Sequence, residues 1–159
     1  DEFKRFIATV SDTPVSEVIF NLLFWSGIRS GEMLALTLND FDFIARTVSI
    51  SKNYTRLDNK DLIFEPKTPK SKRMIALPLF LCDMVNEYAE KLIDYEPSER
   101  LFNVTKHYLR HEMIRGCKVY FKPFHVLFVY FWCDLLVPFN KQGPANPVFM
   151  RIFLCPGPL

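Results

Sequence analysis

Two basic residues in this chain, an arginine and a lysine, have the surroundings expected of groups that act on a phosphate. Arg29 follows Gly27 by two positions and precedes Glu32 by three, and Lys67 lies 38 positions after Arg29 in a basic turn that ends at Arg73. A guanidinium presents a planar fork of N–H donors that matches two phosphate oxygens. A lysine beside it could donate a proton or a charge to the same phosphate. The pair therefore predicts a phosphate site.

Each of these residues also has a purely structural interpretation. Arg29 could be a surface arginine paired with Glu32 three positions on, which stabilises a helix by only about a few tenths of a kcal/mol. The run that contains Lys67 could be a solvated turn, as most charged runs are. The elements around the two residues decide which interpretation is favoured.

The segment before Arg29 is predicted to be an apolar helix. Thr13 and Pro14 form a helix start, and apolar residues follow at helical spacing as far as Trp25. Gly27 is the expected end of this helix, and a second short helix is expected over residues 31–38. This arrangement would hold one guanidinium rigidly.

Lys67 is expected in the turn of a small sheet. Residues 47–53 alternate between polar and apolar, and strands are also predicted over residues 62–65 and 74–77, on both sides of the basic turn. Helices are expected over residues 78–94 and 105–116. The predicted fold class is mainly α with a small three-stranded antiparallel β-sheet (α+β). Residues 1–118 would form the core, and residues 119–159, rich in aromatic residues and proline, a divergent tail.

Two boxes of this sequence resemble those of the tyrosine recombinase (phage integrase) catalytic domain. The first box of that family reads threonine or serine, glycine, an apolar residue, arginine, two further residues and glutamate, then a leucine-rich helix and an acidic turn. Here it is Ser26-Gly27-Ile28-Arg29-Ser30-Gly31-Glu32, continuing to Asp42. The lysine box is matched by Pro66-Lys67-Thr68 and, after more basic residues, by Ile75-Ala76-Leu77-Pro78. The resemblance covers roughly residues 14–116.

The resemblance implies a function in DNA integration and recombination, as in mobile genetic elements. Members cut one DNA strand by attack of a tyrosine on a phosphodiester, which gives a 3′-phosphotyrosyl intermediate. Arg29 would hold the phosphate oxygens, Lys67 would protonate the departing 5′-oxygen, and His125 would assist proton transfer. Glu32 would orient Arg29. The covalent intermediate keeps the bond energy for religation, so no metal and no nucleotide cofactor is expected.

The carboxyl end departs from the family pattern. His125 stands where a His-x-x-Arg box should begin, but Phe128 occupies the position of the second arginine. The last tyrosine is Tyr130, which is too close to His125 to be the expected nucleophile near the carboxyl end. His125 could equally be a lone histidine in an apolar segment. The expected protein is a recombinase fragment that binds DNA but lacks an evident nucleophile, with a tail that is decayed, frameshifted or artificial.

The net charge of +2 does not by itself indicate nucleic-acid binding, but the charges are unevenly spread. Residues 46–73 contain eight Lys or Arg and three acids, which predicts a basic face. A helix lying along DNA is one interpretation of residues 105–116, and a solvated basic helix is the other. His107 and His111 are four positions apart but have no third metal ligand at a suitable spacing. The residues expected to contact double-stranded DNA are Lys70, Ser71, Lys72, Arg73, Lys106 and Arg110.

Self-association on DNA is a further expected interaction, and other classes of protein remain alternatives. The chain could be a structural or interaction domain whose aromatic tail docks on a partner, in which case salt-dependent DNA binding would be absent. Residues 124–137 are too few, at about fourteen with an internal acid, to span a bilayer. Four unpaired cysteines and the lack of a signal peptide predict a cytoplasmic protein with reduced thiols.

Overall fold

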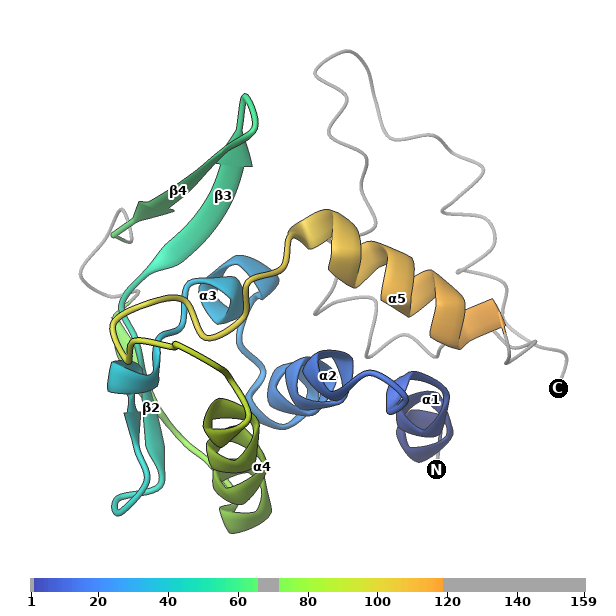
Figure 1. Cartoon of the computed structure of the whole chain (residues 1–159). Helices are drawn as coiled ribbons and strands as arrows, with labels where there is room; N and C mark the ends of the chain where they lie inside the picture. Colours follow the sequence, from blue (N-terminus) through green and yellow to red (C-terminus); the bar gives the residue numbers. More distant parts are fainter. Residues whose placement is uncertain (1, 66–71, 119–159) are drawn as a thin grey trace, which may run out of the picture.

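The structure is a computed structural model that describes residues 2–65 and 72–118. Figure 1 shows its small antiparallel sheets on one side and a layer of helices on the other. The predicted class, α+β with small antiparallel sheets, is confirmed. The elements are α1 (Glu2–Val10), α2 (Pro14–Ser26), α3 (Ser30–Leu34), η1 (Leu38–Asp40), β1 (Phe41–Asp42), β2 (Thr47–Ile50), β3 (Asn53–Leu57), β4 (Lys60–Phe64), β5 (Arg73–Ala76), α4 (Leu79–Glu90) and α5 (Lys106–Lys118).

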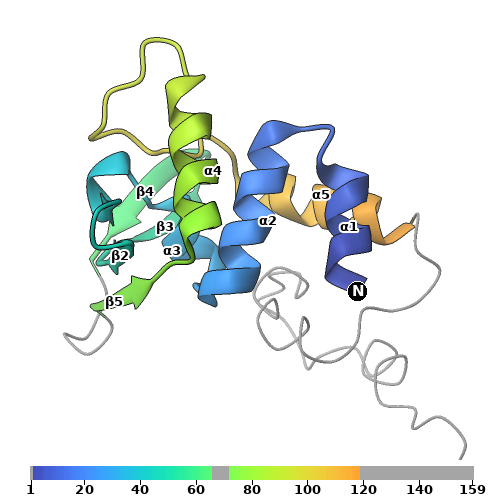
Figure 2. The same cartoon turned by 90° about the horizontal axis from the view of Figure 1, so that it is seen from below.

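The predicted helix before Arg29 is α2, which forms the centre of the helical layer. Figure 2 shows it running between α4 and α1, and it contacts both. Proline at its first turn suits the missing N–H, and the helix ends where Gly27 adopts a left-handed φ of 65°. The Gly27 N–H donates to the Leu23 carbonyl oxygen at 3.1 Å. The start and the end of this helix therefore lie where the sequence predicts them.

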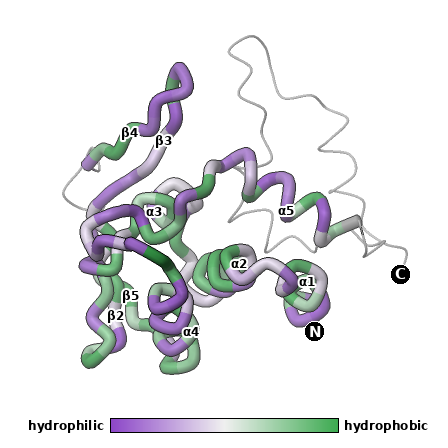
Figure 3. Tube along the Cα trace, viewed as in Figure 1, coloured by the Kyte–Doolittle hydropathy of each residue, from purple (hydrophilic) through white to green (hydrophobic). Residues whose placement is uncertain are grey.

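The core is built around α2, which is apolar on most of its surface because neighbours cover it on several sides. Figure 3 shows α2 as hydrophobic, whereas the tip of the β3–β4 hairpin and much of α5 are hydrophilic. No helix in the described part of the chain is long and apolar enough to cross a membrane. Fully buried core residues include Phe6, Ile19, Phe20, Leu22, Met33, Leu34, Val48, Ile50, Leu81, Val85 and Leu109.

The strands around the basic turn pair differently from the expected single sheet. Strand β5 pairs with β2, giving a three-stranded sheet in the order β1-β2-β5, but β4 pairs with β3 in a separate hairpin. Asp58 and Asn59 connect β3 to β4 with left-handed φ angles of 49° and 61°. A two-residue turn of this kind matches the twist of a hairpin, so β4 folds back on the strand immediately before it. The predicted strand over residues 47–53 is accordingly divided between β2 and β3.

The second predicted helix is shorter than expected, and an additional helix precedes α2. Helix α3 ends at Leu34, and a 3-10 turn, η1, follows it. The Asp40 carboxylate accepts hydrogen bonds from the Thr37 N–H and hydroxyl at 2.8 Å, which caps η1 and separates it from α3. Helix α1 had no counterpart in the sequence prediction, although it buries Phe6 and Val10 in the core.

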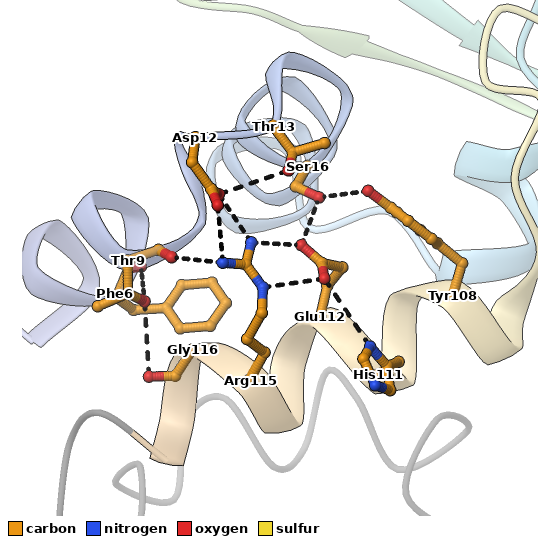
Figure 4. Close-up of polar contacts among 10 residues, drawn as sticks. All are labelled: Phe6, Thr9, Asp12, Thr13, Ser16, Tyr108, His111, Glu112, Arg115 and Gly116. Carbon is orange, nitrogen blue, oxygen red and sulfur yellow. Dashed lines mark hydrogen bonds and ion pairs between the residues drawn. The ribbon is translucent and has the colours of Figure 1, made fainter.

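Replacing Gly116 by alanine should destabilise the fold, because α5 crosses α1 closely at this residue (Figure 4). An added Cβ would lie 2.7 Å from Phe6 Cδ2 and 3.1 Å from Thr9 Oγ1. Phe6 is buried and packs edge-on against Phe20 with ring centroids 4.9 Å apart, so it has little room to move. Overpacking of this kind commonly costs about 1–3 kcal/mol, more than the ~1 kcal/mol gained in helix propensity.

Urea unfolding of Gly116→Ala measures this effect. His107→Ala, on the exposed face of the same helix, is the matched control and should leave the free energy of unfolding nearly unchanged. A Gly116→Ala variant as stable as the parent protein would contradict the close approach of α1 and α5.

Candidate functional site

Arg29 lies at the amino end of α3, directly after the Gly27 turn. It is the N-cap residue, with extended backbone angles, and its N–H donates to Glu32 Oε2 at 2.9 Å. Its side chain also reaches this acid, since Nη1 donates to Glu32 Oε1 at 3.3 Å. The side chain is nevertheless 68% exposed. The local sequence therefore holds Arg29 at its backbone and at one side-chain nitrogen while most of the guanidinium faces solvent.

The Glu32 carboxylate is the centre of this site. Its side chain is only 7% exposed, and it is bound by Arg73 from β5 as well as by Arg29. Burial alone would raise the pKa of Glu32, but hydrogen bonds from the Arg73 side chain and the Arg29 backbone outweigh it, so the pKa lies below its ordinary value. Glu32 is therefore ionised at neutral pH, as the predicted role in orienting Arg29 requires.

Gly31 allows helix α3 to lie close against strand β3, and it was not among the predicted site residues. A Cβ added to Gly31 would collide with the Asn53 side chain and lie 3.0 Å from the Tyr54 carbonyl oxygen. Glycine avoids both contacts, so α3 lies this close to β3 without displacing the Asn53 side chain or the β3 backbone. In the sequence, the glycine between Arg29 and Glu32 is the feature that could have predicted this close approach.

The basic turn that contains Lys67 falls outside the described residues. The same holds for Lys70, Ser71 and His125, so the predicted roles of these four residues stay predictions. The turn is bounded by β4, which ends at Phe64, and by Arg73 at the start of β5. Because Arg73 contacts Glu32, the carboxyl end of the turn lies beside Arg29. The convergence of Lys67 on the Arg29 site stays a prediction, because Lys67 lies outside the described residues.

The two basic residues of the turn that the structure does describe each have an acidic partner. Lys72 Nζ lies 2.9 Å from Glu65 Oε2, and both side chains are exposed. Such a surface pair contributes little and can exchange for a phosphate contact. Arg73 Nη1 donates to Glu32 Oε1 at 3.0 Å, and Nη2 donates to Oε2 at 2.8 Å. Arg73 is thus directed to Glu32, whereas Lys72 extends to the surface.

Helix α5 carries the other two predicted DNA contacts. Arg110 is exposed and Lys106 is half-buried, and neither side chain forms an ion pair within residues 2–65 and 72–118. The amino end of α5 lies beside α3 in Figure 1, and the two helices are in contact. Helix α5, which carries both cations, therefore lies next to the short helix that follows Arg29. Within the same residues, no group of three His, Cys, Asp or Glu side chains could hold a metal ion.

Arg115, a third basic residue of α5, has a different environment from Lys106 and Arg110. Figure 4 shows its guanidinium enclosed by carboxylates of Asp12 and Glu112. Arg115 Nη2 lies 2.8 Å from Asp12 Oδ1 and 2.7 Å from Glu112 Oε2, and Nη1 donates to the Thr9 carbonyl oxygen at 3.1 Å. Its hydrogen bond to Glu112 is the main reason that the pKa of this carboxyl lies below its ordinary value. Arg115 therefore fastens α5 to the α1–α2 turn.

Solved structures share this fold. The integrase of the Tn1549 transposon, in complex with transposon right end DNA, has a TM-score of 0.62 and 20% identity over 74% of this chain and 42% of its own. XerA recombinase has a TM-score of 0.58 and 19% identity over 99% of this chain and 57% of its own. At these identities the likeness establishes the fold class, that of the integrase and recombinase domains.

Sequence similarity points to the same class of protein as the fold does. No family model matches the chain. The ICEBs1 integrase of Bacillus subtilis (strain 168) is 32% identical over 104 residues, which are 65% of this chain and 27% of that integrase. With the shared fold, this confirms the resemblance predicted from the two boxes: the chain is homologous to the catalytic domain of the tyrosine recombinases, or integrases.

Proposed function

We propose that this chain is a DNA-binding portion of a tyrosine recombinase, a class that integrates and recombines DNA through a phosphotyrosyl intermediate. The observation that carries the proposal is the state of Arg29. Its backbone N–H and one side-chain nitrogen are held by the buried Glu32 carboxylate, and its side chain stays 68% exposed. A guanidinium held in this way keeps donors directed to solvent, where a DNA phosphate would approach.

Duplex DNA is the proposed partner, bound with little sequence preference. Phosphate contacts provide affinity without reading bases, and the cations proposed to make them have long side chains. The complexes that the Tn1549 integrase forms with transposon right end DNA and with circular intermediate DNA support this choice of partner. Self-association on DNA and a cytoplasmic location belong to the same proposal. The phosphate contacts are assigned to Arg29, Lys67, Lys70, Ser71, Lys72, Lys106 and Arg110.

The chain as given is proposed to be unable to cleave DNA unaided. Phe128 stands where the resemblance requires a second arginine, and no tyrosine occupies the position of the nucleophile. Lys67 and His125 keep the assigned roles of proton donor and proton-transfer assistant in this proposal. The alternative class, a protein-interaction domain that docks through its aromatic tail, is separated from DNA binding by the experiment below.

Replacing Arg29 by glutamine should weaken duplex binding by about tenfold, because a charge-assisted hydrogen bond to a phosphate contributes roughly 1.5 kcal/mol or more. Fluorescence anisotropy with a labelled duplex of arbitrary sequence measures the dissociation constant. Arg46→Gln is the matched control, since Arg46 is an exposed arginine beside Thr47, at the opposite end of β2 from the Ile50–Arg73 pair. Equal affinities for the two variants would contradict a phosphate contact at Arg29.

A further inference from the structure

Glu32 is shared by two arginines in unequal ways. Arg73 binds both carboxylate oxygens with two terminal nitrogens at 3.0 and 2.8 Å, the paired geometry of a strong arginine–carboxylate contact. Arg29 has one longer side-chain contact with the carboxylate, at 3.3 Å, together with its backbone N–H. Its exposed side-chain fraction is 68%, against 35% for Arg73. Arg73 therefore engages Glu32 with both terminal nitrogens, whereas most of the Arg29 side chain faces solvent.

The buried Glu32 carboxylate needs a charged partner that forms strong hydrogen bonds, as Arg73 does. A charged side chain that is only 7% exposed loses most of its hydration, and it is stable only when it is paired and hydrogen-bonded. If Arg29 were the main partner, its guanidinium would have to turn toward the protein. Because Arg73 balances the charge from the other side, Arg29 keeps Nε and Nη2 without a hydrogen bond within residues 2–65 and 72–118.

The same contact links two elements that are distant in the sequence. Arg73 is paired in register with Ile50, so its backbone position is set by the three-stranded sheet. Glu32 belongs to α3, and it holds the amino end of that helix by accepting the Arg29 N–H. The Arg73–Glu32 pair is therefore the side-chain connection between the sheet and the residue that presents Arg29.

We propose that Arg73 is a positioning residue for the phosphate site: it fixes the Glu32 carboxylate, and through it the backbone and guanidinium of Arg29, and it does not itself bind DNA. This inference rests on the proposed phosphate contact of Arg29. It replaces the expectation that Arg73 grips a phosphate of its own. The two roles differ in ways that can be measured with and without DNA.

The first test needs no DNA. In Arg73→Gln the Arg73 hydrogen bonds and charge that lower the pKa of Glu32 are lost while its burial remains, so this pKa should rise relative to the parent protein. Carbon-detected NMR of the Glu32 carboxyl follows the titration, and the Arg29 amide resonance should shift with the same midpoint because its N–H donates to Glu32. Lys72→Gln removes the same charge one residue away and should leave both signals unchanged.

The second test uses duplex DNA. A positioning residue acts through Arg29, so Arg29→Gln and Arg73→Gln should each lower affinity by about tenfold, and the double variant should bind no more weakly than either alone. A direct phosphate contact would instead give additive losses and a salt slope lower by a further ~0.9. Arg73→Lys keeps the positive charge but not the two-bond geometry, so it should restore less than half of the binding free energy lost in Arg73→Gln. This variant also serves as a control for misfolding of the glutamine variant.

Each outcome has a defined meaning. An unchanged Glu32 titration in both Arg73 variants overturns the proposal, and so do additive losses in the double variant. If Arg29→Gln binds DNA as well as the parent protein does, the proposed phosphate contact of Arg29 is wrong. In that case the Arg29 amide resonance alone would decide whether Arg73 positions Arg29. A shifted resonance in Arg73→Gln supports the positioning role, and an unshifted resonance overturns it.

Discussion

Duplex DNA binding should weaken about a hundredfold when the salt concentration is raised from about 50 to about 200 mM. Each phosphate neutralised by a lysine or arginine releases counterions and adds ~0.9 to the slope of log affinity against log salt, so about four contacts give this loss. Candidates for these contacts are Arg29, Lys72, Lys106 and Arg110, together with the basic turn. Anisotropy titrations at several salt concentrations measure the slope.

Two comparisons make this result specific. Duplexes of unrelated sequence should bind with nearly equal affinity, because phosphate contacts do not read bases. Replacing Lys70 and Lys72 by glutamine should lower the slope by up to about two units. An unchanged slope would show that the basic turn is only a solvated loop. Binding that does not respond to salt would favour the interaction-domain alternative.

No covalent protein–DNA adduct should form with this chain, and introducing Phe128→Arg alone should not produce one. Removing one preorganised phosphate donor commonly costs about a hundredfold or more in rate, and the proposed lack of a placed nucleophile would be more severe. The sequence contains six tyrosines, of which Tyr54, Tyr88, Tyr95 and Tyr108 lie in the described part. Burial raises the pKa of each of these four, which disfavours the phenolate needed for attack.

A suicide substrate with a nick or a 5′-phosphorothiolate traps such an adduct, which a denaturing gel then separates from free DNA. An active tyrosine recombinase on its own nicked site is the positive control. A shifted band that is lost when one tyrosine of this chain is changed to phenylalanine would contradict the prediction and would identify the nucleophile. Tyr54 is the weakest candidate, since it is fully buried and its hydroxyl donates to Asp61 at 2.9 Å.

Much of the Arg29 site could be predicted from the sequence because its signals are local. The proline start and glycine end of α2 depend on backbone angles of single residues. The spacing of three between Arg29 and Glu32 suffices for the acid to accept the arginine N–H at the start of a helix. The family resemblance also rests on short boxes, and both the sequence comparison and the fold confirm it.

The contacts between residues distant in the sequence could not be predicted from local signals. The pairing of β4 with β3 depends on which neighbouring strand a two-residue turn reaches first, and the burial of α1 depends on the partners that cover it. No spacing rule links Arg73 to Glu32 or Arg115 to Asp12, since 41 and 103 positions separate them. Local chemistry is encoded in neighbouring residues, so the sequence specified Arg29 and its turn. Which acid each distant arginine binds was decided only by tertiary packing, because burial and charge pairing depend on residues brought together from different elements.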